Sequence, residues 1–198
     1  MLATLDDLKD ALGFTGTADD AELTSTLAAA SAAAERIAGR PLTRAAGVIE
    51  YPRAYGPIGD KLVYLDRYPV ESVSLVRRRW TLDDAWETLS DGEDYVAMMG
   101  NGKLLTQSIR WPSGHRLIEA TLTGGYADPA SPAPDGASYP PADLQRGVID
   151  TAVAFWNTKA DKGLKSVQVG DGDGQQLLDI ASTATLHAAA TALRRVMA

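Results

Sequence analysis

Residues 117–159, LIEATLTGGYADPASPAPDGASYPPADLQRGVIDTAVAFWNTK, join the two kinds of regular structure found in the rest of the chain. In the first part, apolar Ile118, Ala120 and Leu122 alternate with polar residues, which is the period of a strand with one buried face. Gly124 and Gly125 then free the backbone for a turn. The sequence therefore predicts a half-buried strand over 117–123.

The second part of the same stretch has the period of a helix. Pro141 suits a first helical turn, where its missing N–H is not needed, and Asp143 complements the positive end of the helix dipole. One apolar stripe follows at helical spacing, made of Leu144, Val148, Ile149, Ala152, Phe155 and Trp156. We expect a long buried helix here, so that the two halves of the core meet in this segment.

Two helices are predicted before Gly39. The first has Thr4 as its N-cap and ends at Gly13. The second spans 18–38, and its apolar seam consists of Leu23, Leu27, Ala30, Ala34 and Ile37. The other side carries few charges and consists of Ala28, Ala29, Ala32 and Ala33. That alanine face either lets a neighbouring helix approach closely or reflects only the helix propensity of alanine.

The central part of the chain has the pattern of strands separated by turn residues. The expected strands are 48–55, 61–66, 72–79, 95–99, 103–106 and 117–123. Residues 62–65 are apolar on both faces, which is typical of a central strand. Strands between helical ends predict an α+β fold, with an N-terminal helical pair, a central antiparallel region and the long helix packed on that pair.

Two segments have the composition of loops. Residues 127–140 are rich in Pro, Ala, Ser and Gly and are expected to be exposed and mobile. Residues 163–174 contain GDGDG and resemble a flexible linker. A last helix is expected after it, with an apolar stripe and two terminal cations: Leu186, Ala190, Leu193, Arg194, Arg195 and Met197. We therefore divide the chain into a main domain, 1–162, and a tethered segment, 163–198.

Composition restricts the possible functions of the 198 residues. The net charge of −7 argues against nucleic-acid binding driven by the overall charge of the chain. The absence of cysteine excludes disulfides, cysteine-ligated zinc and cysteine catalysis. No apolar run approaches the roughly 20 residues that span a bilayer, so we expect no membrane partner. The metal and nucleotide motifs that we considered are incomplete. We expect no cofactor, no metal and no catalytic residue.

Two other classes stay open. Arg77-Arg78-Arg79 followed by Trp80 could form a small DNA-binding patch, although Asp83 and Asp84 follow at once and a solvated strand end is the simpler interpretation. A small enzyme would need to use scattered acids such as Asp94 and Glu119. A steep fall of DNA affinity with salt would support the former, and a pocket lined by paired carboxylates the latter.

Several short segments, taken in order, resemble the head-tail connector (head-completion or adaptor) proteins of long-tailed phages and phage-like gene transfer agents. The first is RIAGRPL at 36–42, similar to that family's "I-x-x-x-T-G-R-P-L" segment. LDRYPVESV at 65–73 is similar to its "L-P-x-x-P-V-x-S-V" strand entry, and GKLL at 102–105 followed by Trp111-Pro112 to its "G-x-I…W-P" element. TGGY at 123–126 and PADL at 141–144 are similar to its "T-A-G-Y…V-P-x-D-L" junction. The likeness covers about residues 1–160.

The resemblance implies a structural protein of the head-tail junction in a virion or phage-like particle, assembled in the bacterial cytoplasm. Such proteins form a ring, here expected to be a dodecamer, between the portal protein and a tail-side connector, stopper or tail terminator protein. DNA passes through the ring without specific binding, and the isolated chain is expected to be a monomer. We place the subunit interface at Ala29, Ala33 and Arg36, and the portal contact on the last helix at Leu186, Ala190, Leu193, Arg194, Arg195 and Met197.

Overall fold

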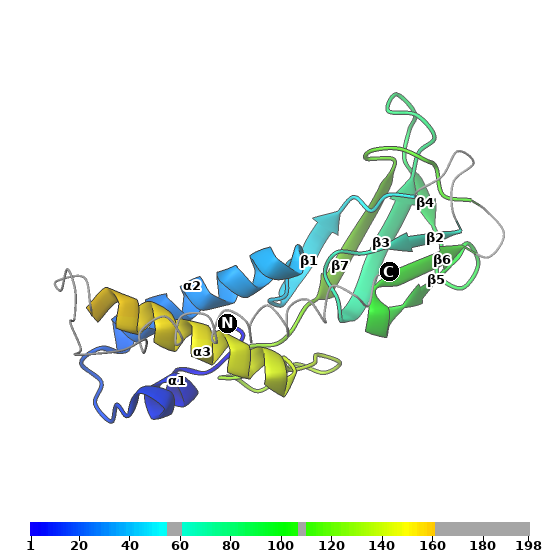
Figure 1. The fold of residues 1–198 in the computed structure, drawn as a ribbon. Coiled ribbons are helices and arrows are strands. Elements are labelled where there is room, and N and C mark those ends of the chain that lie inside the picture. The colour runs from blue at the N-terminus through cyan, green and yellow to red at the C-terminus, as the bar shows by residue number, and fades with distance from the viewer. Residues whose placement is uncertain (55–60, 107–109, 161–198) are drawn as a thin grey trace.

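The computed structural model describes residues 1–54, 61–106 and 110–160. Figure 1 shows two parts side by side, a helical module at one end and two β-sheets at the other. The chain builds α1 and α2, then all the strands, and returns to the helical module as α3. The predicted α+β fold is confirmed, including the long helix packed on the N-terminal pair.

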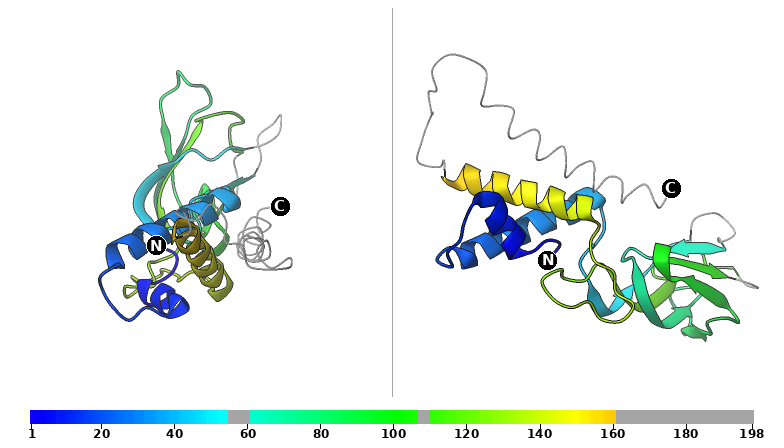
Figure 2. Two further views of the ribbon diagram at one scale, coloured as in Figure 1. Left: turned by 60° about the vertical axis from the view of Figure 1, so that its left-hand side comes forward. Right: turned by 90° about the horizontal axis from the view of Figure 1, so that it is seen from below.

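The helical module consists of α1 (Leu5–Leu12), α2 (Asp20–Ala38) and α3 (Ala142–Ala160). Thr4 caps α1 as predicted, since its side chain accepts a hydrogen bond from the Asp7 N–H, and the left-handed residues Gly13 and Gly39 end α1 and α2. The three helices contact one another in pairs (Figure 2). Their core is made chiefly of Leu8, Leu23, Leu27, Ala30, Ala34, Leu144, Val148 and Ala152.

The strands form two antiparallel sheets. The larger has the order β1-β7-β3-β4 and contains β1 (Ala45–Glu50), β3 (Val70–Arg78), β4 (Glu87–Leu89) and β7 (Ile118–Gly124). The smaller has the order β2-β6-β5 and contains β2 (Leu62–Tyr64), β5 (Tyr95–Met98) and β6 (Lys103–Thr106), with a short 3₁₀ turn, η1 (Met99–Asn101), before β6. Residues of both sheets share a second core, which includes Val63, Leu65, Val76, Leu104, Trp111, Ile118, Ala120 and Leu122.

Strand β7 lies inside the larger sheet between β1 and β3. Its predicted alternation is confirmed, because Ile118, Ala120 and Leu122 are all buried. Glu119, on the other face, is buried as well, and its carboxylate accepts the Arg77 Nε–H at 2.7 Å, which offsets the cost of burying its charge. The strand therefore carries both the core and a charged contact to β3.

Several predictions about individual elements are wrong. Strand β2 lies at the edge of its sheet, not at the centre, and β4 was not predicted. Phe155, which we assigned to the buried stripe of α3, is 42% exposed, whereas Trp156 packs against the helical core as predicted and meets Phe14 edge to face with 5.7 Å between ring centroids.

The loop 127–140 is largely exposed, but its two ends are fixed. The Ala127 N–H donates to the Ser138 carbonyl at 2.8 Å, and the Tyr139 hydroxyl both accepts from the Ala133 N–H and donates to the Ser131 carbonyl. These bonds hold the loop against itself, which composition alone did not indicate.

Candidate assembly surfaces

Three of the segments that carry the family resemblance meet where the helical module joins the sheets. We call this region the junction. It consists of Glu35, Arg40, Leu42, Thr43, Arg44, Glu50, Arg67, Tyr68, Glu71, Gly125 and Tyr126. Backbone hydrogen bonds connect its segments. The Tyr126 N–H donates to the Leu42 carbonyl at 2.7 Å, and the Arg44 N–H donates to the Tyr126 carbonyl at 2.8 Å. The motifs therefore have a structural role in joining the two modules.

Glu35 holds the turn between α2 and β1. Its Oε1 accepts hydrogen bonds from the Leu42 N–H at 2.8 Å, the Thr43 N–H at 2.9 Å and the Thr43 hydroxyl at 2.8 Å. Burial raises the pKa of Glu35, but these bonds and the charge of Arg67 outweigh burial, so the pKa lies below its ordinary value. The carboxylate is thus the form that this turn stabilises.

Arg40 fills the space between the two cores. Its guanidinium carbon lies 3.3 Å from the centroid of the Tyr68 ring, and its Nη1 donates to the Tyr68 carbonyl at 2.7 Å. Burial lowers the pKa of Arg40, while Tyr68 and Tyr126 oppose that effect. A buried cation over an aromatic face fixes a specific geometry more strictly than an apolar contact does.

Two further carboxylates tie β1 and β3 to neighbouring segments. Glu71 forms a two-pronged ion pair with Arg44, at 2.7 and 2.9 Å, and this bond raises the pKa of Arg44. Glu50 accepts the backbone N–H groups of Asp66 and Arg67, although burial raises the pKa of Glu50 overall. The junction is a polar joint in which most charges have defined partners.

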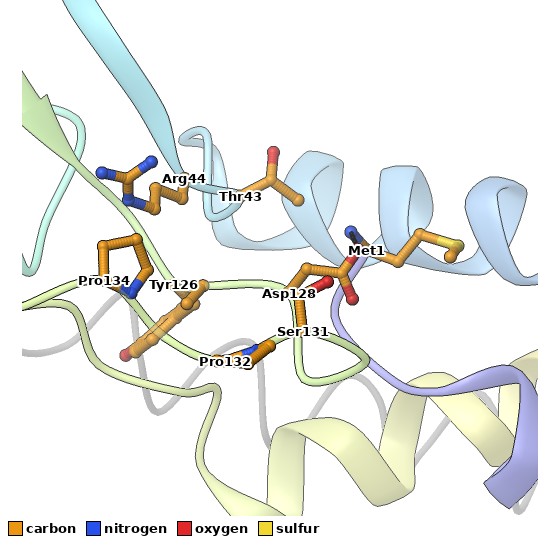
Figure 3. Close-up of a pocket in the computed structure, with 9 residues that line it drawn as sticks. Met1, Thr43, Arg44, Tyr126, Asp128, Ser131, Pro132 and Pro134 are labelled. Atoms are coloured by element: carbon orange, nitrogen blue, oxygen red, sulfur yellow. Dashed lines mark hydrogen bonds and ion pairs between the residues drawn. The ribbon is translucent and has the colours of Figure 1, made fainter.

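A pocket of about 340 Å³ opens beside the junction (Figure 3). Its wall includes Thr43, Arg44, Tyr126, Asp128 and Met1, together with the Pro-rich loop. The terminal ammonium of Met1 lies 3.3 Å from the Asp128 carboxylate, and Arg44 is engaged by Glu71. The charges on the wall are therefore already paired within the chain.

Helix α2 presents a face of small residues to solvent. Ala28, Ala29, Ala32 and Arg36 are exposed, whereas the opposite face packs in the helical core. Ala33, which we had placed on the outer face, is only 9% exposed and belongs to the core. Its position lies only about 60° from that of the seam residue Ala30 on the helical wheel, at the border of the buried face, and the packing of the helical core covers it. Ala29 and Arg36 remain available to a partner.

The arginine run does not form a solvated strand end. Arg78 is only 7% exposed and bonds to Glu87 at 2.9 Å and to the Arg110 carbonyl at 3.2 Å. Arg77 pairs with Glu119, and Arg79 donates to the carbonyl oxygens of Leu82 and Arg116. The run is thus engaged largely within the chain, which argues against a DNA-binding patch built on these three residues.

The acids named for the enzyme alternative have separate structural partners. Asp94 accepts the Ser90 N–H at 2.9 Å in a turn before β5, while Glu119 is paired with Arg77 inside the larger sheet. Within residues 1–54, 61–106 and 110–160, no group of three metal-ligating side chains comes together. No helix in this part of the chain is long and apolar enough to cross a bilayer.

Several predicted features lie outside the described residues. They are the boundary at 162, the linker 163–174, and the expected portal-binding residues Leu186, Ala190, Leu193, Arg194, Arg195 and Met197. These remain predictions from the sequence.

No protein-family model matches the chain, and no curated protein matches it in sequence. Among solved structures, it is similar to a chain in "Neck of empty GTA particle computed with C6 symmetry", where GTA stands for gene transfer agent, with a TM-score of 0.58 and 21% identity. The match covers 95% of this chain and 89% of the other. The chain has the fold of a gene transfer agent neck protein.

Two further structures of the same kind support this statement about the fold. A chain in the virion of the native gene transfer agent particle gives a TM-score of 0.54 at 22% identity, covering 94% of this chain and 88% of the other. A chain in the native neck computed with C12 symmetry gives 0.51 at 19% identity, covering 93% and 88%. The three comparisons thus cover at least 93% of this chain and at least 88% of the other.

Proposed function

We propose that the chain is a structural adaptor of a phage or gene transfer agent particle, which forms a ring between the portal vertex and the tail. The observation that carries this proposal is the likeness of fold, over 95% of the chain, to a protein of a gene transfer agent neck. The related necks are described with C6 and C12 symmetry, which agrees with copies arranged around an axis. In this role the ring completes the head and offers a platform for the tail.

The proposed ring is a homo-oligomer of twelve copies with two different neighbours. The portal protein lies on one side and a tail-side connector, stopper or tail terminator protein on the other. A ring requires a head-to-tail contact between two different surfaces of the same chain. The exposed small residues of α2, with Ala29 and Arg36, supply one such surface, because they let a neighbouring subunit approach the helix backbone.

The role assigned to DNA is passage without specific binding. A net charge of −7 per chain repels a polyanion, so DNA within the ring is not gripped as it passes. The cations at 77–79 bond mainly within the chain, which agrees with this role.

The portal contact is assigned to the expected C-terminal helix. Its apolar stripe, Leu186, Ala190, Leu193 and Met197, would lie in a groove of the portal, with Arg194 and Arg195 at the rim against acidic residues. The alternative is a helix that packs permanently on its own subunit. Repeated weak contacts around a ring supply avidity, so each contact needs only modest strength.

Mass measurement tests the ring. The purified chain should run as a monomer or a weak associate, and with the portal it should form a closed ring with one mass class. A chain that stays monomeric in the presence of a correctly assembled portal would refute the adaptor role.

Truncation after Gly174 tests the portal contact. The shortened chain should keep its melting temperature and lose portal binding, because the removed segment would contribute to the interface and not to the core. A large drop in melting temperature would instead support a helix packed on the core, and normal portal binding would remove the segment from the interface.

A further inference from the structure

One end of the larger sheet gathers arginines and aromatic side chains. Strands β1 and β3 end where β4 and β7 begin, so segments 51–53, 77–87 and 110–117 meet there, at the end remote from the helices (Figure 1). We call this surface the arginine end. Its members are Tyr51, Arg53, Arg77, Arg78, Arg79, Trp80, Leu82, Trp86, Arg110 and Arg116.

Its arginines lie against aromatic rings. The guanidinium carbons of Arg77 and Arg79 lie 4.9 and 4.5 Å from the centroid of the Trp86 ring. Arg78 lies 5.0 Å from the ring of Trp80, and Arg116 lies 5.3 Å from that of Tyr51. Stacking of this kind restricts long side chains before any partner arrives, which lowers the entropy cost of binding.

The tip of the β3–β4 hairpin exposes two large apolar side chains. Trp80 is 55% exposed and Leu82 is 61% exposed. The tip is nevertheless fixed, because Arg79 Nη1 donates to the Leu82 carbonyl at 2.8 Å and the Thr81 N–H donates to Asp84 Oδ2 at 2.8 Å. An uncovered tryptophan on a fixed loop, next to a second exposed apolar side chain, is typical of a protein contact surface.

The charge of this end differs from that of the whole chain. Six arginines stand against four carboxylates, namely Asp83, Asp84, Glu87 and Glu119, in a chain whose net charge is −7. The cations are arginines without a single lysine, and Arg53 and Arg116 are exposed. Arginine, tryptophan and tyrosine are enriched in protein–protein interfaces and lysine is depleted. The interleaved carboxylates disfavour a DNA backbone as the partner.

We propose that the arginine end is the docking surface for a protein whose contact face carries carboxylates around an apolar pocket. Trp80 and Leu82 enter the pocket, while Arg53 and Arg116 meet the carboxylates with flat, two-pronged geometry. The inference rests on the proposed function, which supplies the occupant. A ring between two neighbours needs a second surface besides the portal contact, so the occupant is the tail-side neck protein.

The test uses the full chain and the tail-side neck protein that accompanies it in the same particle. Affinity for that protein is measured for the wild type, for Trp80→Ala combined with Leu82→Ala, and for Arg116→Glu. Both variants should bind roughly tenfold or more weakly. Arg146→Glu is the matched control, since Arg146 is an exposed arginine on α3 in the helical module, and it should bind as the wild type does.

Portal binding and duplex binding separate the possible failures. All variants should still bind the portal, because the changed residues lie outside the proposed portal contact. If the wild type itself does not bind the portal, the proposed function is wrong. The docking surface would be overturned if the wild type did not bind the tail-side neck protein. It would also be overturned if both arginine-end variants bound that protein as tightly as the wild type does. Binding of a short DNA duplex by the wild type that Arg116→Glu abolishes would overturn it too, because the end would then be a nucleic-acid surface.

Discussion

Glu35 holds the turn between the helices and the sheets through one carboxylate oxygen. That oxygen accepts three hydrogen bonds, two of them from backbone N–H groups that have no helix or sheet partner of their own. Hydrogen bonds to a charged acceptor are worth about 1.5–3 kcal/mol each, against about 1 kcal/mol for neutral pairs. Glu35 therefore contributes more to the stability of this turn than a neutral acceptor in the same place would.

Glu35→Gln should lower the free energy of unfolding by about 1 kcal/mol at pH 7, because the amide oxygen still accepts the bonds but carries no charge. The pKa of Glu35 is lowered in the folded state, so its contribution is present above the ordinary value of 4.5 and is lost as the pH falls through the folded pKa. Urea denaturation at neutral and at acidic pH measures this. An equal gap between variant and wild type at both would refute it.

Gly125 lies where two backbones touch. A Cβ at this position would be 2.6 Å from the Thr43 carbonyl oxygen, and its φ of 93° already disfavours other residues. Gly125→Ala should cost more than about 2 kcal/mol of stability, since the junction must open to relieve the clash. Gly92→Ala is the control: its φ is 84° but nothing lies within 4 Å of a Cβ there. Equal melting temperatures for the two variants would show that the close approach is unimportant.

At the scale of the element, α2 has one face buried in its own core and an exposed face, which the proposed ring uses for a neighbouring subunit. Ala29→Glu should leave the monomer as stable as the wild type and prevent ring formation with the portal, because it places a charge and bulk in a close contact. Ala11→Glu on the exposed side of α1 is the matched control. Circular dichroism and mass measurement check both variants. Normal rings with Ala29→Glu would remove α2 from the subunit interface.

The sequence predicted well those elements in which the pattern of apolar residues repeats several times. The stripe Leu144, Val148 and Ala152 and the alternation around Ala120 each repeat often enough to be recognised. Strand β4 has only three residues and exists because Val76 and Leu89 pair across the hairpin, so its own sequence carries no period. Strand β2 has apolar residues on both faces, yet it lies at a sheet edge.

The candidate surfaces were predicted less completely than the elements. Ala29 and Ala33 are four residues apart and look alike in sequence, but only the packing of α1 and α3 decides which one is buried. Likewise Arg78 is indistinguishable in sequence from its neighbours, while the hairpin pairing buries it against Glu87. Which side of an element meets another element is a tertiary property that periodicity leaves open.

At the scale of the whole molecule, the net charge of −7 on each chain adds up over the copies of the proposed ring. Twelve such chains in the proposed ring repel one another, and this repulsion acts between exposed groups that salt screens. Rings assembled on the portal should therefore form more completely at about 0.5 M salt than at about 0.05 M. Sedimentation at the two salt concentrations measures the ring fraction. A ring that dissolves at high salt would indicate that surface ion pairs, not the apolar α2 face, hold the subunits together.

The order of the elements along the chain also determines the order in which the two cores can form during synthesis. Helices α1 and α2 leave the ribosome first, but their core needs Leu144 and Val148 of α3, which follow α2 by about 100 residues. At about 5–20 residues per second, the N-terminal pair waits several seconds while every strand of both sheets emerges. The sheets thus complete first, as a unit inserted into an unfinished helical bundle. Until α3 emerges, the leucines of α1 and α2 lack the residues that cover them, so in the proposed assembly the chain would join a ring only after α3 has packed over them.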